Sequence, residues 1–169
     1  MRPLLFYNVA TIVWLPAKNE IPAEYMQAAS GIDHGCFDHP AIILWIDPTG
    51  TEAMILMMTS FGGQDLQRRH PNSDRMRSHY LPVHPSSPHP DNGSLLYLRE
   101  DALLSRNSYI ITAPRRTIKA ALLRPYKGQT CVLRADPFDK LKEYINFRVP
   151  PASFISNAVC QLCLVGFDL

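Results

Sequence analysis

Two short apolar runs in the first third of the chain predict a β-hairpin. Residues 41–46 read Ala-Ile-Ile-Leu-Trp-Ile, residues 53–58 read Ala-Met-Ile-Leu-Met-Met, and the Asp-Pro-Thr-Gly segment at 47–50 suits a tight turn. Both runs are apolar at consecutive positions, so both faces of the hairpin need to be covered. A terminal helix or a second copy of the chain would cover them, and we expect a homodimer in preference to a monomer.

Other segments with a regular pattern predict three further strands and two helices. A short helix over residues 22–29 would begin at its proline and stop at Gly31. The second helix is expected to begin with Asp136 as its N-cap and to end before Pro150 and Pro151, with apolar residues at helical spacing on one face. The three further strands are predicted over residues 94–99, 108–112 and 130–134.

Between the hairpin and these later strands the pattern is lost. Residues 61–93 are rich in glycine, arginine and histidine, and four prolines between 82 and 90 argue against central strand pairing, so we expect a long loop. The predicted organisation is therefore an N-terminal extension (1–21), a domain over 22–149 that contains a long loop at 60–93, and a C-terminal tail (150–169).

Length and composition favour a single domain. The chain has 169 residues, of which 46% are hydrophobic, enough for one core. Lys and Arg total 17 against 15 Asp and Glu, so the protein is only mildly basic and nucleic-acid binding would depend on a local positive patch. Because no stretch approaches about 20 apolar residues, we expect no insertion into a membrane.

Four cysteines, at positions 36, 131, 160 and 163, are too few and too unevenly spaced for a disulfide framework. Reduced thiols predict a cytoplasmic protein, although the apolar residues 4–15 after Arg2 leave secretion open. Cys160 and Cys163 have the spacing of half a zinc or redox site without a second half, so we interpret them as structural or incidental.

The hairpin and its flanks resemble the PemK/MazF-like toxin family. The resemblance rests on Gly-Cys-Phe-Asp-His-Pro-Ala-Ile-Ile-Leu at 35–44, followed by a second apolar strand that ends in Thr59 and Ser60. It extends over roughly residues 30–147. Residues 59–63 and 89–93 resemble a fungal branch of such proteins more closely. The resemblance implies an SH3-like barrel, mainly β with a C-terminal helix, that is commonly dimeric and cuts single-stranded RNA without a metal.

The same resemblance implies a site and partners. In the active toxins an arginine before the proline and a Thr or Ser at the end of the second strand serve the cleaved phosphate. The second position corresponds to Thr59, but the first is His39 in this chain. Histidine lacks the permanent charge and bidentate fork of arginine, yet it can act as a general acid or base. An antitoxin-like protein partner is also implied.

Metal-independent RNA cleavage needs a base for the ribose 2′-hydroxyl, an acid for the leaving oxygen and cations for the phosphate. We therefore predict a catalytic set of His39, Thr59, Ser60 and Arg68, with no metal and no cofactor. Basic residues of the predicted loop and of a later segment would bind the nucleic acid: Arg69, His70, Arg75, Arg77, Arg115 and Arg116. The histidines at 79, 84 and 89 are spaced by five, which matches no common metal-binding motif.

A second reading of the same residues is a binding module without catalysis. In that reading the barrel is retained, and residues 60–93 recognise a protein or a nucleic acid. The histidine at position 39 favours this alternative, whereas the hydroxyl pair at 59–60 and the arginines favour an endoribonuclease. Whether the chain is an enzyme is left open by the sequence.

Overall fold

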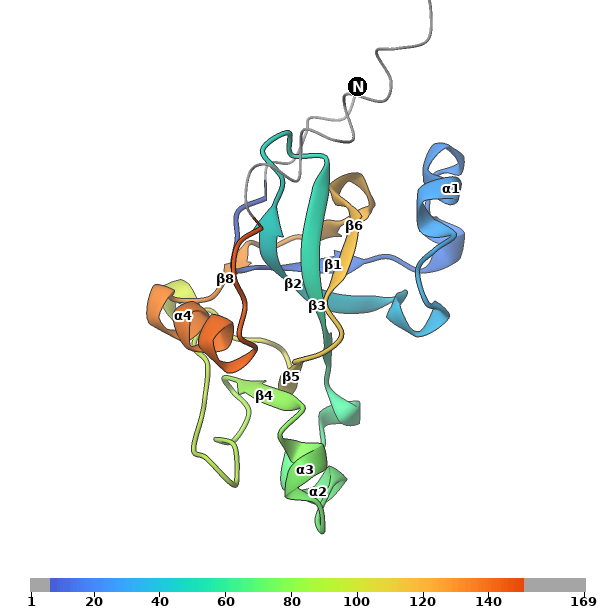
Figure 1. Ribbon diagram of the computed structural model, residues 1–169. Helices are drawn as coiled ribbons and strands as arrows, with labels where there is room; N and C mark the ends of the chain where they lie inside the picture. The colour runs from blue at the N-terminus through green and yellow to red at the C-terminus, as the bar shows by residue number, and fades with distance from the viewer. Residues whose placement is uncertain (1–6, 151–169) are drawn as a thin grey trace, which may run out of the picture.

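The centre of the computed structural model, which describes residues 7–150, is the predicted hairpin (Figure 1). Strands β2 (His39–Ile46) and β3 (Glu52–Thr59) pair antiparallel, with a register shift between Ile43 and Trp45. The connecting turn is held by the Asp47 carboxylate, which accepts the backbone N–H of Glu52 at 2.7 Å and of Thr49 at 3.3 Å. The hairpin prediction is confirmed.

Eight antiparallel strands form the sheet, so the mainly β prediction is confirmed. The order along its main path is β4-β5-β3-β2-β1-β7, while β6 pairs with β3 and β8 pairs with β1. The remaining strands are β1 (Thr11–Leu15), β4 (Tyr80–Val83), β5 (Ser108–Ile111), β6 (Arg116–Lys119), β7 (Arg124–Pro125) and β8 (Cys131–Val132). Strands β5 and β8 lie within the segments predicted at 108–112 and 130–134.

Strand β1 corrects the predicted N-terminal extension. Residues 11–15 pair with β2 along one edge and with β7 and β8 along the other, so they lie inside the sheet. Ile12, Val13 and Leu15 are fully buried. The prolines and polar residues after Leu15 therefore mark the end of a strand and not a domain boundary.

The sheet is not closed into a barrel. The strand predicted at 94–99 is reduced to two isolated bridges, Val83 with Leu96 and Leu98 with Leu133, which lie between β4 and the chain just after β8. A 3-10 turn at Arg99–Asp101 ends this segment. The two ends of the sheet are thus connected by single bridges in place of a continuous strand.

Residues 60–93 are more regular than the predicted loop. They contain a 3-10 turn (Phe61–Gly63), the helices α2 (Leu66–Arg69) and α3 (Asp74–Arg77), and β4. Proline is tolerated in β4 because this strand is at the edge of the sheet, where a strand needs backbone hydrogen bonds to only one neighbouring strand. Pro82 still accepts the N–H of Leu96 at 2.9 Å.

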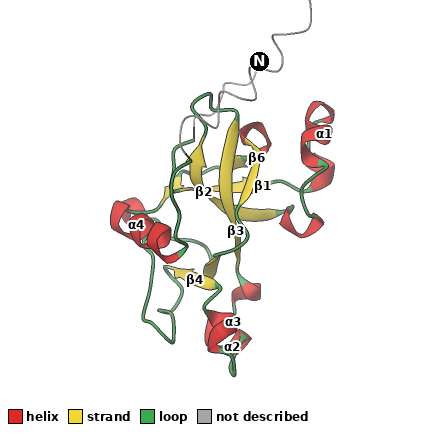
Figure 2. Ribbon diagram, in the orientation of Figure 1, coloured by secondary structure: helices red, strands yellow, loops and turns green. Residues whose placement is uncertain are grey.

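Helices cover the two faces of the sheet from within the chain (Figure 2). Phe138 and Leu141 of α4 (Ala135–Tyr144) pack on one face, and Ala29 of α1 (Met26–Ala29) packs on the other. The consecutive apolar positions of β2 and β3 are explained by these two layers. The homodimer stays a prediction, but the sheet does not require a second copy to bury its faces.

The helix predictions are confirmed with adjusted starts. A 3-10 turn (Ala23–Tyr25) leads into α1, within the predicted 22–29. Helix α4 has Arg134 and not Asp136 at its N-cap position, because the Arg134 carbonyl accepts the N–H of Phe138 at 3.1 Å. Other 3-10 turns are Lys18–Glu20, His34–Cys36 and Ala120–Leu122.

No helix within residues 7–150 is long and apolar enough to cross a membrane. The tail from 151, including Cys160 and Cys163, lies outside the described residues.

Candidate functional site

The start of β2 and the end of β3 lie next to each other at one end of the sheet. Ala41 pairs with Met57, and continuing this antiparallel register places His39 opposite Thr59. His39 also pairs with Leu15 of β1, and Thr59 also pairs with Tyr109 of β5. The hairpin register therefore brings two of the predicted catalytic residues into one row.

A pocket of ≈ 350 Å³ opens at this end of the sheet. His39, Thr59 and Ser60 line it together with two basic residues that the sequence analysis did not select, Arg106 and Lys127. Other lining residues supply aromatic rings and a carboxyl group: Trp14, Phe61, Tyr126 and Asp38. Two cations against one carboxylate leave one net positive charge among the described lining residues, which matches one phosphodiester.

The His39 imidazole is held in a defined tautomer. Its Nδ1 lies 2.8 Å from the carbonyl oxygen of Phe37, and because a carbonyl can only accept, Nδ1 carries the proton and donates it. In the neutral ring, Nε2 then has a free lone pair. The side chain is exposed, and Nε2 bonds no other residue in the range 7–150. A neutral His39 can therefore accept a proton at Nε2 from a bound molecule.

The Thr59 hydroxyl lies where β3 turns sharply. Its oxygen accepts the N–H of Phe61 at 3.4 Å, which leaves the hydroxyl hydrogen available for another acceptor. Three consecutive residues then have left-handed backbone angles, with φ of 48° at Phe61, 66° at Gly62 and 91° at Gly63. This turn directs the chain away from the strand and leaves Thr59 and Ser60 at the rim of the pocket.

The Gly63→Ala variant tests the need for this turn. We expect it to lower the free energy of unfolding by about 1 kcal/mol, because an alanine in the left-handed region is strained. Gly31→Ala is the matched control, since an added Cβ would meet nothing within 4 Å at either glycine and Gly31 is not left-handed. Urea unfolding of both variants gives the comparison. Equal effects at the two positions would contradict the prediction.

The predicted Arg68 does not line the pocket. It is an exposed residue of α2, and its neighbour Arg69 places its guanidinium 5.6 Å from the centre of the Phe61 ring. Arg106 and Lys127 line the pocket in its place. The Lys127 ammonium donates to the Ser105 hydroxyl at 2.6 Å, so the turn after β7 and the segment before β5 bring these two cations together.

His70 belongs to an aromatic cluster behind the turn and does not reach the pocket. Its ring stacks on Tyr80 with a centroid distance of 5.5 Å and meets the edge of Phe61 at 5.8 Å. Its Nε2 is buried without a hydrogen-bond partner among the described residues. Burial, together with the charges of Arg69 and Arg77, lowers the pKa of His70, so the ring is neutral at pH 7.

The lowered pKa of His70 predicts a pH-dependent stability. The folded protein binds this proton less readily than the unfolded chain, so the free energy of unfolding falls as the pH drops below the ordinary histidine pKa of about 6.5. His70→Phe removes this contribution and the unpaired nitrogen, and we expect a flatter pH profile and a higher melting temperature at pH 6. Thermal melts of both proteins between pH 5 and 8 provide the measurement. Parallel profiles would contradict the prediction.

Arg75 and Arg77 differ although they lie in one short helix. Arg75 is exposed, whereas the Arg77 side chain is 9% exposed and forms two hydrogen bonds to the Asp91 carboxylate, at 2.6 and 2.7 Å. Arg77 also donates to the carbonyls of His70 and Pro71. The prediction that Arg77 binds nucleic acid is therefore corrected, because its donors are already used inside the protein.

Arg115 and Arg116 lie away from the pocket as well. The Arg116 guanidinium donates to the Asp33 carboxylate at 2.5 Å and to the Cys36 sulfur at 2.9 Å, and Arg115 lies over the Phe147 ring at 5.8 Å. Neither lines the pocket. The extended basic surface predicted from these two residues is thus not continuous with the site.

The three histidines at positions 79, 84 and 89 have separate structural roles. His89 is buried and joins the carbonyl of Arg77 to the N–H of Asp91 through its two ring nitrogens. His84 stacks on Tyr97 at 5.3 Å, and the His79 carbonyl accepts the backbone N–H of Thr112. Within residues 7–150 no group of three or more His, Cys, Asp or Glu residues could hold a metal ion.

Arg106 and Lys127 are the functional candidates that sequence reasoning missed. Lys127 has a weak sequence signal, since Lys-Gly at 127–128 suits a turn in which both residues have positive φ, 48° and 70°. Arg106 lies two residues before a strand that was predicted, but nothing in its local sequence marks it. Comparison of the chain with protein-family models, with curated proteins and with solved structures finds no match.

Proposed function

We propose that the chain binds single-stranded RNA at the pocket between β2 and β3 and cleaves it without a metal. One observation carries the proposal: His39, Thr59 and Ser60 line the same pocket as Arg106 and Lys127. This set supplies the base and the cations that the reaction needs around one phosphodiester, together with two hydroxyl donors, and water is left to act as the acid.

Each group has a role in the proposed reaction. His39 Nε2 takes the proton of the ribose 2′-hydroxyl, and the 2′-oxygen then forms a bond to phosphorus. Lys127, Arg106 and the hydroxyls of Thr59 and Ser60 stabilise the negative charge that develops on the phosphate oxygens. The bond to the 5′-oxygen breaks, this oxygen takes a proton from a water molecule, and the hydroxide that is left removes the proton from His39. The products are a 2′,3′-cyclic phosphate, a 5′-hydroxyl and neutral His39.

Aromatic rings beside the cations support a single-stranded substrate. Trp14 and Tyr126 line the pocket with centroids 6.2 Å apart and ring planes inclined at 48°. Lys127 lies 5.6 Å above the Tyr126 ring. Tyr126 is only 8% exposed, so an unpaired base would stack on the partly exposed Trp14 ring while the phosphates meet the cations, whereas the bases of a duplex are not available for stacking.

A kinship with the SH3-like barrels of PemK/MazF-like proteins is part of the same proposal. It is supported by the order of the elements, in which a β2–β3 hairpin is followed by β5 and a C-terminal helix. The bridges through Leu96 and Leu98 also support it, because they lie where a further strand would close the sheet. This chain has His39 where the family has an arginine. We therefore expect this position to contribute a base and not a fixed cation.

A binding role without catalysis is the second candidate. It is favoured by the internal bonds of residues 60–93, where Arg77, Asp91 and His89 hold the segment in one arrangement. A surface that is already ordered loses less conformational entropy when it binds a partner. In this case RNA or a protein would bind and would dissociate without being cleaved.

Incubation of the purified protein with single-stranded RNA in EDTA distinguishes the two candidates. Endoribonuclease activity predicts fragments that end in a 2′,3′-cyclic phosphate, and binding without cleavage predicts intact RNA whose retention weakens as salt is raised. Intact RNA at a large excess of protein would refute catalysis. The absence of salt-sensitive retention as well would refute RNA binding at this pocket.

A further inference from the structure

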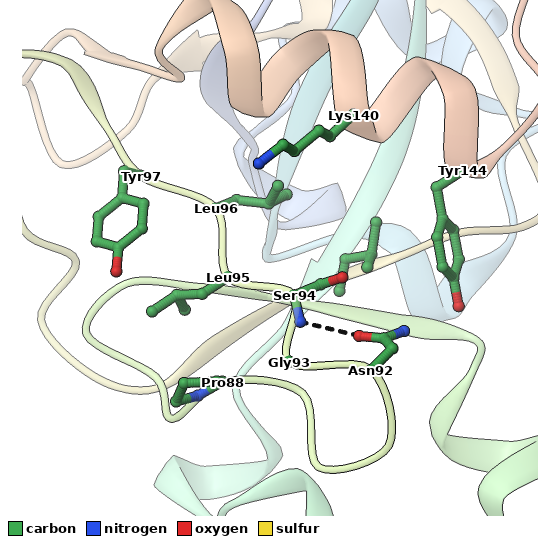
Figure 3. A pocket seen from close by; sticks show the side chains of 10 residues that line it. Pro88, Asn92, Gly93, Ser94, Leu95, Leu96, Tyr97, Lys140 and Tyr144 are labelled. Carbon is green, nitrogen blue, oxygen red and sulfur yellow. Dashed lines mark hydrogen bonds between the residues drawn. The ribbon is translucent and has the colours of Figure 1, made fainter.

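A second pocket, of ≈ 400 Å³, lies between α4 and residues 92–97 (Figure 3). Lys140 and Tyr144 of α4 form one side, the 92–97 segment forms the other, and Leu81 of β4 also lines it. It shares no lining residue with the pocket at His39. The resemblance and the proposed RNA site therefore leave this pocket unexplained.

Three polar side chains of this pocket can donate hydrogen bonds to a ligand. Figure 3 shows the Lys140 ammonium directed from α4 toward the 92–97 segment, and Lys140 makes no hydrogen bond or ion pair with any residue between 7 and 150. The Asn92 side-chain oxygen accepts the N–H of Ser94 at 2.9 Å, so its NH₂ group is left to donate. The Ser94 hydroxyl is a further donor.

No acidic side chain competes for these donors among the described lining residues. Asp91, the neighbour of Asn92 in the chain, is engaged by two hydrogen bonds from Arg77. An unpaired ammonium beside two neutral donors provides one positive charge and several N–H and O–H groups. This set matches the single charge and two oxygens of a carboxylate, whereas a phosphate dianion would leave one charge unbalanced.

The rest of the pocket wall is apolar and held in place. Leu81 and Leu96 are each 2% exposed, and Leu95 and Pro88 lie beside them. The Tyr144 ring faces the pocket and is fixed by its hydroxyl, which donates to the Ser78 carbonyl at 2.7 Å. Leu81 and Leu96 form the buried floor, whereas the half-buried Leu95, the exposed Pro88 and the Tyr144 ring present apolar surface to water, so a ligand with an apolar body would cover that surface.

We propose that this pocket binds a small monocarboxylate with an apolar body of about eight carbons, a size that a pocket of this volume accommodates. Its carboxylate would lie between Lys140, Asn92 and Ser94, and its hydrocarbon would lie on Pro88, Leu95 and the Tyr144 ring. The proposal does not depend on RNA binding, because the two pockets share no residue.

Titration of the full-length protein with octanoate, followed by calorimetry and by amide chemical shifts, tests the proposal. We expect binding of octanoate, with shifts concentrated at Asn92, Gly93 and Ser94, and much weaker binding of acetate, which lacks the body, and of octylamine, which reverses the charge. Lys140→Met keeps the length of the side chain but removes the charge. It should weaken octanoate binding about tenfold or more.

Lys142→Met is the matched control on the same helix. Lys142 pairs with Asp139 at 2.7 Å and does not line the pocket, so this variant should bind octanoate as the wild type does. Octanol has the apolar body without the negative charge. It should therefore bind the wild type and Lys140→Met with equal affinity. Three results would each overturn the proposal. They are no binding of octanoate, amide chemical shift changes that lie only outside residues 92–94, and equal octanoate affinities of the wild type and Lys140→Met.

Discussion

Replacement of His39 by alanine is expected to slow metal-independent RNA cleavage by about 10²–10⁴-fold, the usual contribution of a positioned general base. The Nδ1 hydrogen bond to the Phe37 carbonyl holds the ring so that Nε2 has the free lone pair, and no other imidazole lines the pocket among the described residues. Single-turnover cleavage of a fluorescent RNA in EDTA measures the effect on the chemical step.

Two further variants separate catalysis from binding. His39→Arg restores a fixed cation without a base, so it should retain RNA while cleaving poorly. Lys127→Ala should weaken RNA binding and reduce its salt dependence, because it removes a phosphate contact. The Arg116→Ala variant is a control outside the pocket, since Arg116 pairs with Asp33. Unchanged cleavage by His39→Ala would show that this imidazole is not the base.

Replacement of Arg77 by alanine is expected to lower the melting temperature by roughly 5–10 °C. This side chain joins α3 to two other parts of residues 60–93, because it donates to Asp91 and to the adjacent carbonyls of His70 and Pro71. Its own carbonyl accepts a bond from the buried His89 ring. Removing the guanidinium leaves the carboxylate and the two carbonyls without their donor, which is more costly than the loss of an exposed ion pair.

Arg75→Ala is the matched control for Arg77→Ala. Both arginines belong to α3, but Arg75 is exposed and its side chain bonds nothing within the described part of the chain. We expect its melting temperature to stay within about 1 °C of the wild type. Arg77→Lys should fall between the two, because an ammonium cannot reproduce the fork that meets Asp91. Similar losses for Arg75→Ala and Arg77→Ala would contradict a specific role for the Arg77–Asp91 pair.

Local patterns were sufficient to predict the parts of the fold that are made of neighbouring residues. The β2–β3 hairpin has two apolar runs around an Asp-Pro-Thr-Gly turn, and α4 has apolar residues at helical spacing before two prolines. Strand β1 was missed because its partners, β2, β7 and β8, are distant in sequence. Strand β4 was missed because Pro82 argues against a strand unless its position at the sheet edge is known.

The candidate site, like the fold, could be predicted only where it is made of residues from one local pattern. His39, Thr59 and Ser60 could be grouped from sequence, since one hairpin register places two strand ends side by side. Arg106 and Lys127 approach the pocket only after β7 has paired with β1 and β5 has paired with β3. Arg77 could not be recognised as structural, because its partner Asp91 lies 14 positions away in a segment without a regular pattern.

The position of β1 has a practical consequence for the preparation of this protein. A shortened version that begins after Leu15 would keep the hairpin but remove the strand beside it. The outer backbone N–H and C=O groups of β2 would then be exposed as a long, apolar edge, which is a template for pairing with other molecules. Such a version should be prone to aggregation, and affinity tags at the N-terminus need a spacer that leaves residues 11–15 free to pair.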